Sequence, residues 1–352
     1  MRGNSTPNET SVSATIAQYL VEHSPTFKEL TNLRQKGWKT AEGDRYFENR
    51  RAQSDNADRK QAQRFFNMTC QIGEEMDRKT SVITFAATDR GLSPRVLDIG
   101  MAPGGFTETV LRKHCDATIR GITLPLENGG LKVMLPRWKA DPRVIVEFLD
   151  VTMLADEMGR PTTSIPTVHP DIANFSSNRP FQGENFDLVF CGATAQRAHV
   201  RADYRESQER LRLATSQLVV ALQRLRDHGS LVLVMHKPEA LYTAEIIRTF
   251  TRFSNVRLFK PRKKHAVRSS FYMVATSVDM QSKETQSAIL GWKKQWENAT
   301  FQSDDALSAS SRVSEDRVCE MLAEFGLQLI KLATPVWRTQ ADGLRSAPFL
   351  KE

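Results

Sequence analysis

The chain has 352 residues, and 40% of them are hydrophobic, which suffices for a core in one large domain with additions or in two modest domains. The formal net charge of +8 and the pI near 9.4 allow a polyanionic partner, but by themselves they favour RNA only weakly. No window approaches about 18 uninterrupted apolar residues, and no basic start followed by an apolar core opens the chain. We therefore expect a cytoplasmic or nuclear protein that is neither secreted nor inserted in a membrane.

The four cysteines are scattered along the chain, at Cys70, Cys115, Cys191 and Cys319, and none of them belongs to a Cys-x-x-Cys pair. This usage argues against a zinc site and against a disulfide framework. We therefore predict reduced thiols and no bound metal.

The N-terminal quarter is predicted to be helical. Residues 1–12 are rich in Asn, Ser and Thr without periodicity, so we expect a mobile tail there. In the helical region 13–90, apolar residues first recur at three- and four-residue steps, with a break near Ser24-Pro25 that favours two short helices. A further helical stretch, from about 41 to 78, ends with an apolar face that should pack on the core: Phe65, Phe66, Met68, Thr69, Ile72 and Met76.

The stretch from Arg95 to Phe106 is the centre of the predicted fold. Val96 to Ile99 is a short apolar run of strand character, and it leads through a glycine-rich turn into a helical pattern at 107–114. A strand, a tight turn and a helix start are together typical of a nucleotide-type site, because glycines let the backbone approach a ligand and the helix start supplies free N–H groups. Asp98 stands where a carboxylate can order the turn. The spacing departs from Gly-x-Gly-x-x-Gly, and no P-loop lysine follows.

Strands and helices alternate through the middle of the chain. Strands are predicted at 118–124, 144–149, 186–190, 230–235, 256–259 and 271–276, helices at 205–226 and 240–253, and a long loop insertion at 159–183. This alternation implies a mostly parallel sheet, and the last two strands are joined too tightly for a crossover, so they should be antiparallel. The remaining chain is polar and helical, with helices predicted at 286–299 and 314–330 and a linker at 303–311.

Two stretches carry a recognisable family pattern. Residues 98–106 read Asp-Ile-Gly-Met-Ala-Pro-Gly-Gly-Phe, and residues 258–275 contain Lys-Pro, Arg-Ser-Ser and Tyr in order. Both resemble the FtsJ-like family of S-adenosylmethionine-dependent RNA methyltransferases, and the wording is similar to fungal FtsJ-domain proteins. The resemblance covers about residues 62–278. It implies an α/β, Rossmann-like methyltransferase fold, with a seven-stranded, mostly parallel sheet that has one antiparallel strand. The methyltransferase domain is expected at 91–280, between an N-terminal helical extension and a C-terminal helical extension at 281–352.

The resemblance also implies S-adenosylmethionine as the cofactor. The residues that it assigns to cofactor binding are Asp98, Gly100, Ala102, Pro103, Gly104, Gly105, Phe106, Thr123, Asp150, Val151 and Cys191. Asp150 resembles the residue that accepts a hydrogen bond from the adenine amino group, although an Asp at this place also suits a helix N-cap. Related enzymes often bind the cofactor ribose with an acidic residue where this chain has Thr123, so we expect the backbone or Glu127 to take that role.

Enzymes of this family use a Lys-Asp-Lys-Glu tetrad to hold a ribose 2′-hydroxyl and to ease its deprotonation. Lys237 is the one tetrad-like residue of this sequence, about three positions beyond the family's place, and we take it as the candidate catalytic residue. His236 and Glu239 lie beside it, either as a polar cluster or as parts of a rim salt bridge. The other three tetrad positions are substituted: Asn67, the pair Cys191-Gly192, and Ser270.

A dense basic segment points to RNA as the partner. Six basic groups on one short segment suit phosphate contacts, although a solvated basic loop is an equally good interpretation. These residues are Arg257, Lys260, Arg262, Lys263, Lys264 and Arg268.

The predicted function is methyl transfer from S-adenosylmethionine to the ribose 2′-hydroxyl of RNA, with RNA methylation and ribosomal RNA processing as its context. Two alternatives stay open: a methyltransferase for a small molecule, and a catalytically inactive protein of this fold that binds the cofactor or RNA. A deep, closed, apolar cavity beside the sulfonium would favour the small molecule, whereas an open basic groove would favour RNA.

Overall fold

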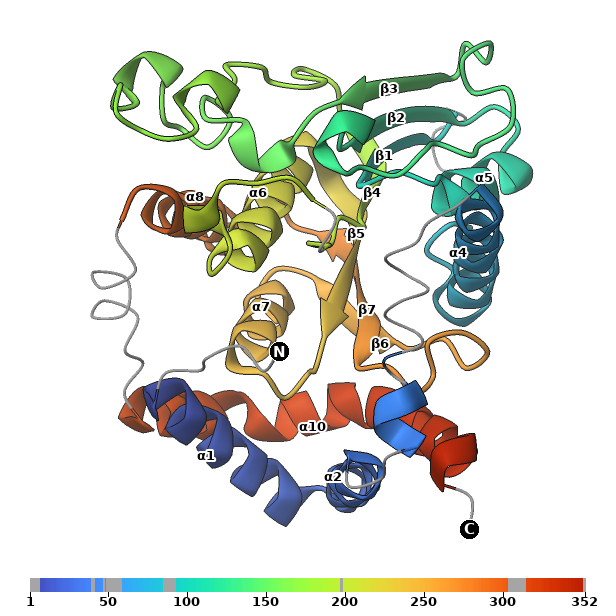
Figure 1. The fold of residues 1–352 in the computed structure, drawn as a ribbon, viewed down its shortest axis with the longest axis vertical. Helices are drawn as coiled ribbons and strands as arrows, with labels where there is room; N and C mark the ends of the chain where they lie inside the picture. The colour runs from blue at the N-terminus through green and yellow to red at the C-terminus, as the bar shows by residue number, and fades with distance from the viewer. Residues whose placement is uncertain are drawn as a thin grey trace.

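The computed structural model describes residues 7–38, 42–46, 48, 59–84, 93–196, 199–302 and 315–350 (Figure 1). Its centre is a seven-stranded sheet in the order β3-β2-β1-β4-β5-β7-β6. The strands are β1 (Arg95–Ile99), β2 (Thr118–Thr123), β3 (Val144–Phe148), β4 (Phe186–Cys191), β5 (Leu225–His236), β6 (Asn255–Phe259) and β7 (Ser270–Val278).

The sheet is parallel except at β7. Strands β1 to β5 pair in parallel, and β7 runs antiparallel to both β5 and β6. Residues 260–269, which we call the basic loop, join β6 to β7, and this connection is too short for a parallel crossover. The predicted fold class is therefore confirmed, and the carboxyl ends of β1 to β6 all lie at one edge of the sheet.

Helices cover both faces of the sheet. Helices α4 (Arg59–Thr80) and α5 (Gly105–Lys113) lie on one face, and α6 (Glu209–Arg224) and α7 (Leu241–Thr251) lie on the other (Figure 1). The predicted apolar face of α4 is confirmed at Phe66, Ile72 and Met76, which are buried. Helix α8 (Lys283–Phe301) packs against α6.

The two ends of the chain meet in one group of helices beside β6 and α7 (Figure 1). Helices α1 (Pro7–His23) and α2 (Pro25–Trp38) confirm the predicted break, and both pack on α10 (Glu315–Arg345), with the rings of Phe27 and Trp337 4.8 Å apart. Helix α1 begins inside the segment predicted as a tail, so the tail is wrong for residues 7–12. Residues 1–6 and the predicted linker 303–311 lie outside the described residues.

Helix α10 is longer than predicted, because it continues past Ile330 and through Pro335. Proline costs an intrahelical hydrogen bond, but buried side chains on the following turns, Val336 and Trp337 among them, keep the helix on the core. A continuous apolar core links α1 and α10 to the sheet, while the domain boundaries at 13–90, 91–280 and 281–352 stay a prediction. Among the described helices, none has the length and apolar character to cross a membrane.

Candidate active site

The glycine-rich turn after β1 is fixed by the strands on either side. The N–H group of Gly100 donates to the Ile122 carbonyl of β2 at 2.8 Å, and the N–H group of Gly192 after β4 donates to the Ile99 carbonyl, also at 2.8 Å. Gly100 has φ of +79°, and an added Cβ would lie 2.4 Å from the Ala193 nitrogen. The turn therefore requires glycine here, because two backbones approach each other in a left-handed conformation.

An open cavity of about 100 Å³ lies beyond the carboxyl ends of β1, β2 and β4. Strands β1 and β4 are neighbours, but the chain leaves β1 toward α5 on one face and β4 toward α6 on the other. This is the topological switch point, where open α/β sheets bind their ligands.

Five of the residues predicted to bind the cofactor line this cavity: Gly100, Ala102, Thr123, Asp150 and Val151. The Thr123 hydroxyl accepts a hydrogen bond from the Ala102 N–H group at 3.4 Å, so it joins the end of β2 to the turn. Glu127 is exposed and does not belong to the lining. Binding of the cofactor ribose by the backbone or by Glu127 stays a prediction.

The other six predicted cofactor residues do not line the cavity. They lie at the end of β1, in the turn after it, at the start of α5 and at the end of β4: Asp98, Pro103, Gly104, Gly105, Phe106 and Cys191. Asp98 is 2% exposed and accepts a hydrogen bond from the Thr107 hydroxyl at 2.7 Å, so it orders the turn as predicted. Burial raises the pKa of Asp98 to about 6, although the hydrogen bonds from Thr107 oppose this shift. Burial, with the nearby Asp98, also raises the pKa of the Cys191 thiol.

Two different reasons explain the glycines at the start of α5: backbone conformation for Gly104 and close packing for Gly105. Gly104 has φ of +104°, a conformation that favours glycine. A Cβ on Gly105 would lie 2.7 Å from the Cys70 nitrogen of α4, so these two helices touch through backbone. Phe106 stacks on Phe190 of β4, with the ring centroids 5.1 Å apart.

Several residues of the cavity wall escaped the sequence prediction. Phe65 reaches the cavity from α4, and most of the others come in the chain after β4, whose carboxyl end faces the cavity. They are Gly130, Leu131, Gln196, His199, Val200, Arg205, Glu209 and Leu213. A rule that assigns every segment after a parallel strand to the site would have found them.

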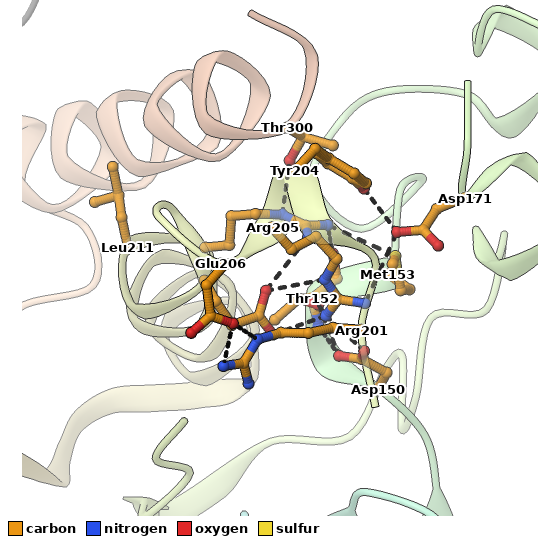
Figure 2. Close-up of polar contacts among 12 residues, drawn as sticks. Asp150, Thr152, Met153, Asp171, Arg201, Tyr204, Arg205, Glu206, Leu211 and Thr300 are labelled. Atoms are coloured by element: carbon orange, nitrogen blue, oxygen red, sulfur yellow. Dashed lines mark hydrogen bonds and ion pairs between the residues drawn. The ribbon is translucent and has the colours of Figure 1, made fainter. Parts of the chain in front are cut away.

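Asp150 is bound into a buried ionic network (Figure 2). It caps the short 3-10 helix Val151–Met153, accepting from the Thr152 N–H group at 3.0 Å, which confirms the N-cap interpretation. Its other oxygen accepts from the Arg205 guanidinium at 2.9 Å, and Arg205 also binds Glu209. Burial alone would raise the pKa of Asp150, but the charge of Arg205 and the Thr152 hydrogen bonds outweigh it and lower the pKa.

Lys237 lies where β5 ends, next to β4 in the sheet. Its φ of +50° is unusual for a residue with a side chain, and two backbone hydrogen bonds hold it there, from Lys237 N–H to Ser269 and from Ala240 N–H to Lys237. Lys237 is exposed and does not line the cavity. Among the substituted tetrad positions, Gly192 lines the cavity, Asn67 is exposed on α4 and Ser270 pairs with His236 across β5 and β7.

Glu239 forms the rim salt bridge that was one of its two interpretations. Its carboxylate accepts from Arg34 of α2 at 2.6 Å and from the Trp337 ring N–H of α10 at 3.3 Å. Glu239 therefore fastens the terminal helices to the end of β5.

The six cations of the predicted basic segment, which lie on β6 and the basic loop, differ in how exposed they are. Arg257 on β6, Arg262 and Lys263 are exposed, and Lys264 and Arg268 are half-buried. The prediction that Lys260 contacts phosphates is wrong, because its side chain points inward and is buried. The Lys260 ammonium donates to the carbonyls of His265, Arg268 and Ser270 at 3.1, 2.6 and 2.7 Å.

The sheet order and the cavity at its switch point are those of a Rossmann-like methyltransferase. The model of the FtsJ-like methyltransferase family matches residues 74–278, which is more than half of the chain. The chain therefore belongs to the FtsJ-like methyltransferase family, and it is an S-adenosylmethionine-dependent methyltransferase. No curated protein matches the sequence.

Solved methyltransferase structures are similar to the chain at low sequence identity. A protein named as a ribosomal RNA methyltransferase from Plasmodium falciparum is 15% identical, with 59% of this chain and 96% of that chain covered and a TM-score of 0.38. An O-methyltransferase family protein from Burkholderia thailandensis is 12% identical, with 76% and 72% covered and a TM-score of 0.35. Human methyltransferase-like protein 13, in complex with SAH, is 11% identical, with 63% and 90% covered and a TM-score of 0.32.

Proposed function

We propose that the protein transfers a methyl group from S-adenosylmethionine, held in the cavity, to the ribose 2′-hydroxyl of RNA. The cavity wall suits the cofactor: the turn at Gly100 offers backbone without bulk, Thr123 offers a hydroxyl, and Asp150 offers a carboxylate whose side chain keeps 18% exposure. The bound cofactor supplies an electrophilic methyl group on a sulfonium.

The observation that carries the RNA substrate is a group of cations where β5 ends, one strand away from the cavity. Lys237 and Arg210 are exposed there, and neither forms an ion pair with the described residues. Desolvation of the ring and the positive charges of Arg210, Lys260, Lys237 and Arg268 lower the pKa of His236. A phosphate that binds beside the exposed Lys237 and Arg210 would neutralise their positive charge.

The basic loop extends this potential along the same edge of the sheet. The side chains of Arg262 and Lys263 are exposed, and the Arg262 backbone N–H group donates to Glu75 of α4 at 2.9 Å, which fixes where the loop lies. A strand of RNA that crosses the carboxyl edge could place one phosphate near Lys237 and others near the loop. Phosphate contacts of this kind position a substrate without reading its sequence.

The chemistry required of the protein is limited. Bound S-adenosylmethionine would give its methyl group to the 2′-hydroxyl oxygen in line with the carbon–sulfur bond, that bond would break to leave S-adenosylhomocysteine as a neutral thioether, and the hydroxyl proton would pass to solvent or a base. The positive charge of Lys237 would stabilise the developing alkoxide, and alignment with exclusion of water supplies the rest.

The substitutions at Asn67, Gly192 and Ser270 favour a second candidate function, a protein that binds the cofactor and RNA without transferring the methyl group. Each positioned acid–base group typically contributes about 10²- to 10⁴-fold to a rate. A chain that lacks three of them would rely on alignment and on Lys237 alone.

The test is methyl transfer to total RNA with methyl-labelled S-adenosylmethionine, followed by digestion of the RNA to nucleosides. The proposal predicts label in 2′-O-methylnucleosides. Label in base-methylated nucleosides, or only in a small-molecule fraction of a cell extract, would contradict it. Binding of S-adenosylhomocysteine and RNA without any transfer would establish the second candidate.

A further inference from the structure

The carboxylate of Asp150 has one hydrogen-bonding place left for a ligand. Its Oδ1 atom accepts from the Thr152 N–H group at 3.0 Å and from the Thr152 hydroxyl at 2.7 Å, and its Oδ2 atom accepts from Arg205 Nη2 at 2.9 Å. An ionised carboxylate offers about four lone-pair sites. Three are taken, and the free one is on Oδ2, beside the arginine.

The Asp150 side chain belongs to the cavity wall. Asp150 and Arg205 both line the cavity, and the Asp150 side chain keeps 18% exposure while that of Arg205 keeps 5%. The other carboxylates of the network, Glu209 and Asp171, keep only 7% and 6%. Asp150 is therefore the most exposed carboxylate of the network.

Arg205 itself cannot turn away from Asp150. Its Nε and Nη2 atoms donate to the two oxygens of Glu209, at 3.0 and 2.7 Å, in the fork geometry that fixes a guanidinium plane. Its Nη2 atom also lies 2.8 Å from the Thr152 hydroxyl, which shares the two N–H groups of Nη2 with Asp150 and Glu209. The Arg205 guanidinium therefore contacts both Asp150 and Thr152, the residue that donates to the other oxygen of Asp150.

The C-terminal extension braces the same network. Arg212 of α6 contacts Glu209 at 3.4 Å and donates to the Thr300 hydroxyl of α8 at 3.1 Å. The ring N–H group of Trp296, also on α8, donates to the Thr152 carbonyl at 2.9 Å. Helix α8 therefore supports Thr152 and Glu209, the two residues that hold Arg205 and Asp150 in register.

We propose that Arg205 is a positioning residue for adenine recognition: it holds the Asp150 carboxylate so that the one free site on Oδ2 accepts the exocyclic amino group of the cofactor. The inference rests on the cofactor site of the proposed function but not on its RNA substrate. A ligand with an acceptor instead of the amino group meets a carboxylate and is rejected. The charge network, and not the family motif alone, thereby sets the preference of the site for adenosine.

The test compares S-adenosylhomocysteine with S-inosylhomocysteine, which carries a carbonyl oxygen in place of the amino group, by titration calorimetry. In the unaltered protein S-adenosylhomocysteine should bind about tenfold or more tightly, as expected for a hydrogen bond to a charged group. In Arg205→Met this ratio should fall at least about fivefold, chiefly through weaker S-adenosylhomocysteine binding. Arg248→Met is the control, because Arg248 of α7 pairs with the exposed Glu324 of α10 and neither residue lines the cavity.

A purely structural role of Arg205 would weaken both ligands equally and leave the ratio unchanged, which would overturn the proposal. If Arg205→Met does not fold, Arg205→Lys keeps the charge but not the fork, and its ratio should be intermediate. Tight binding of both ligands to the unaltered protein with no preference would also overturn the proposal, whatever the outcome of the RNA methylation test.

Discussion

The Lys260 ammonium lies 2.7 Å from the carbonyl oxygen of Ser270, so the residue that begins the basic loop is bonded to the residue that begins β7. The same ammonium also binds two carbonyls inside the loop. All three of its N–H groups are thus used to close a loop on which Arg262 and Lys263 stay exposed. Lys260 shapes the surface that we expect RNA to meet without touching the RNA.

Lys260→Met should destabilise the protein, because three loop carbonyls lose their hydrogen-bond donor. We expect a loss of about 2–3 kcal/mol in the free energy of unfolding. Lys263→Met is the matched control, since Lys263 is exposed on the same loop, and it should stay within about 0.5 kcal/mol. Urea denaturation measures both, and equal midpoints for the two variants would show that the buried ammonium is dispensable.

Gly100→Ala should weaken binding of S-adenosylhomocysteine by about tenfold or more, because a Cβ only 2.4 Å from the Ala193 nitrogen must displace a residue of the cavity wall. Gly183→Ala provides the control for backbone strain. Gly183 has φ of +83°, close to the +79° of Gly100, but an added Cβ would meet nothing within 4 Å. Backbone strain should cost both variants about 1–2 kcal/mol of stability, the clash should cost Gly100→Ala more, and calorimetry should find normal affinity only in Gly183→Ala. Normal affinity in both would move the site elsewhere.

Asp98→Asn should change the pH dependence of stability. The folded pKa of Asp98 is about 6, above its ordinary 3.8, so between these values the native state binds the proton more readily than the unfolded state. The ionised carboxylate therefore costs stability above pH 6, and this cost disappears as the pH falls toward 4. Relative to Asp98→Asn, the unaltered protein should gain about 2 kcal/mol between pH 6 and pH 4. Parallel stability curves from denaturation at several pH values would refute the raised pKa.

Replacing Arg262, Lys263 and Lys264 together with Ala should weaken RNA binding at every sequence tested. The plot of log affinity against log salt should flatten by up to about 2 units, because each neutralised phosphate of a single strand releases about 0.7 of a counterion. Cofactor affinity should not change. The double variant Lys331→Ala, Arg338→Ala removes exposed cations from α10 instead and serves as the control. If both variants alter the salt slope equally, the basic loop is not a specific contact.

The sequence predicted best those features that local chemistry dictates. The turn at Gly100 and the burial of Asp98 follow from backbone conformation and from the strand that precedes them, so the motif alone reveals them. Arg205 could not be predicted in this way, because its partner Asp150 is 55 residues away in the chain and only the packing of α6 brings them together. The prediction for Lys260 was wrong for a related reason. A dense run of cations in the sequence does not reveal which of their side chains turns inward.

Lys237→Ala gives the most direct test of the central claim, that the cofactor cavity and the cations beside it act together on RNA ribose. We expect the variant to bind S-adenosylhomocysteine as tightly as the unaltered protein, because Lys237 does not line the cavity. The rate of 2′-O-methylnucleoside formation on RNA should fall by about 100-fold or more, since the alkoxide loses its positive neighbour. Lys331→Ala should keep the normal rate. Transfer to RNA ribose that proceeds at the normal rate in Lys237→Ala would contradict the account.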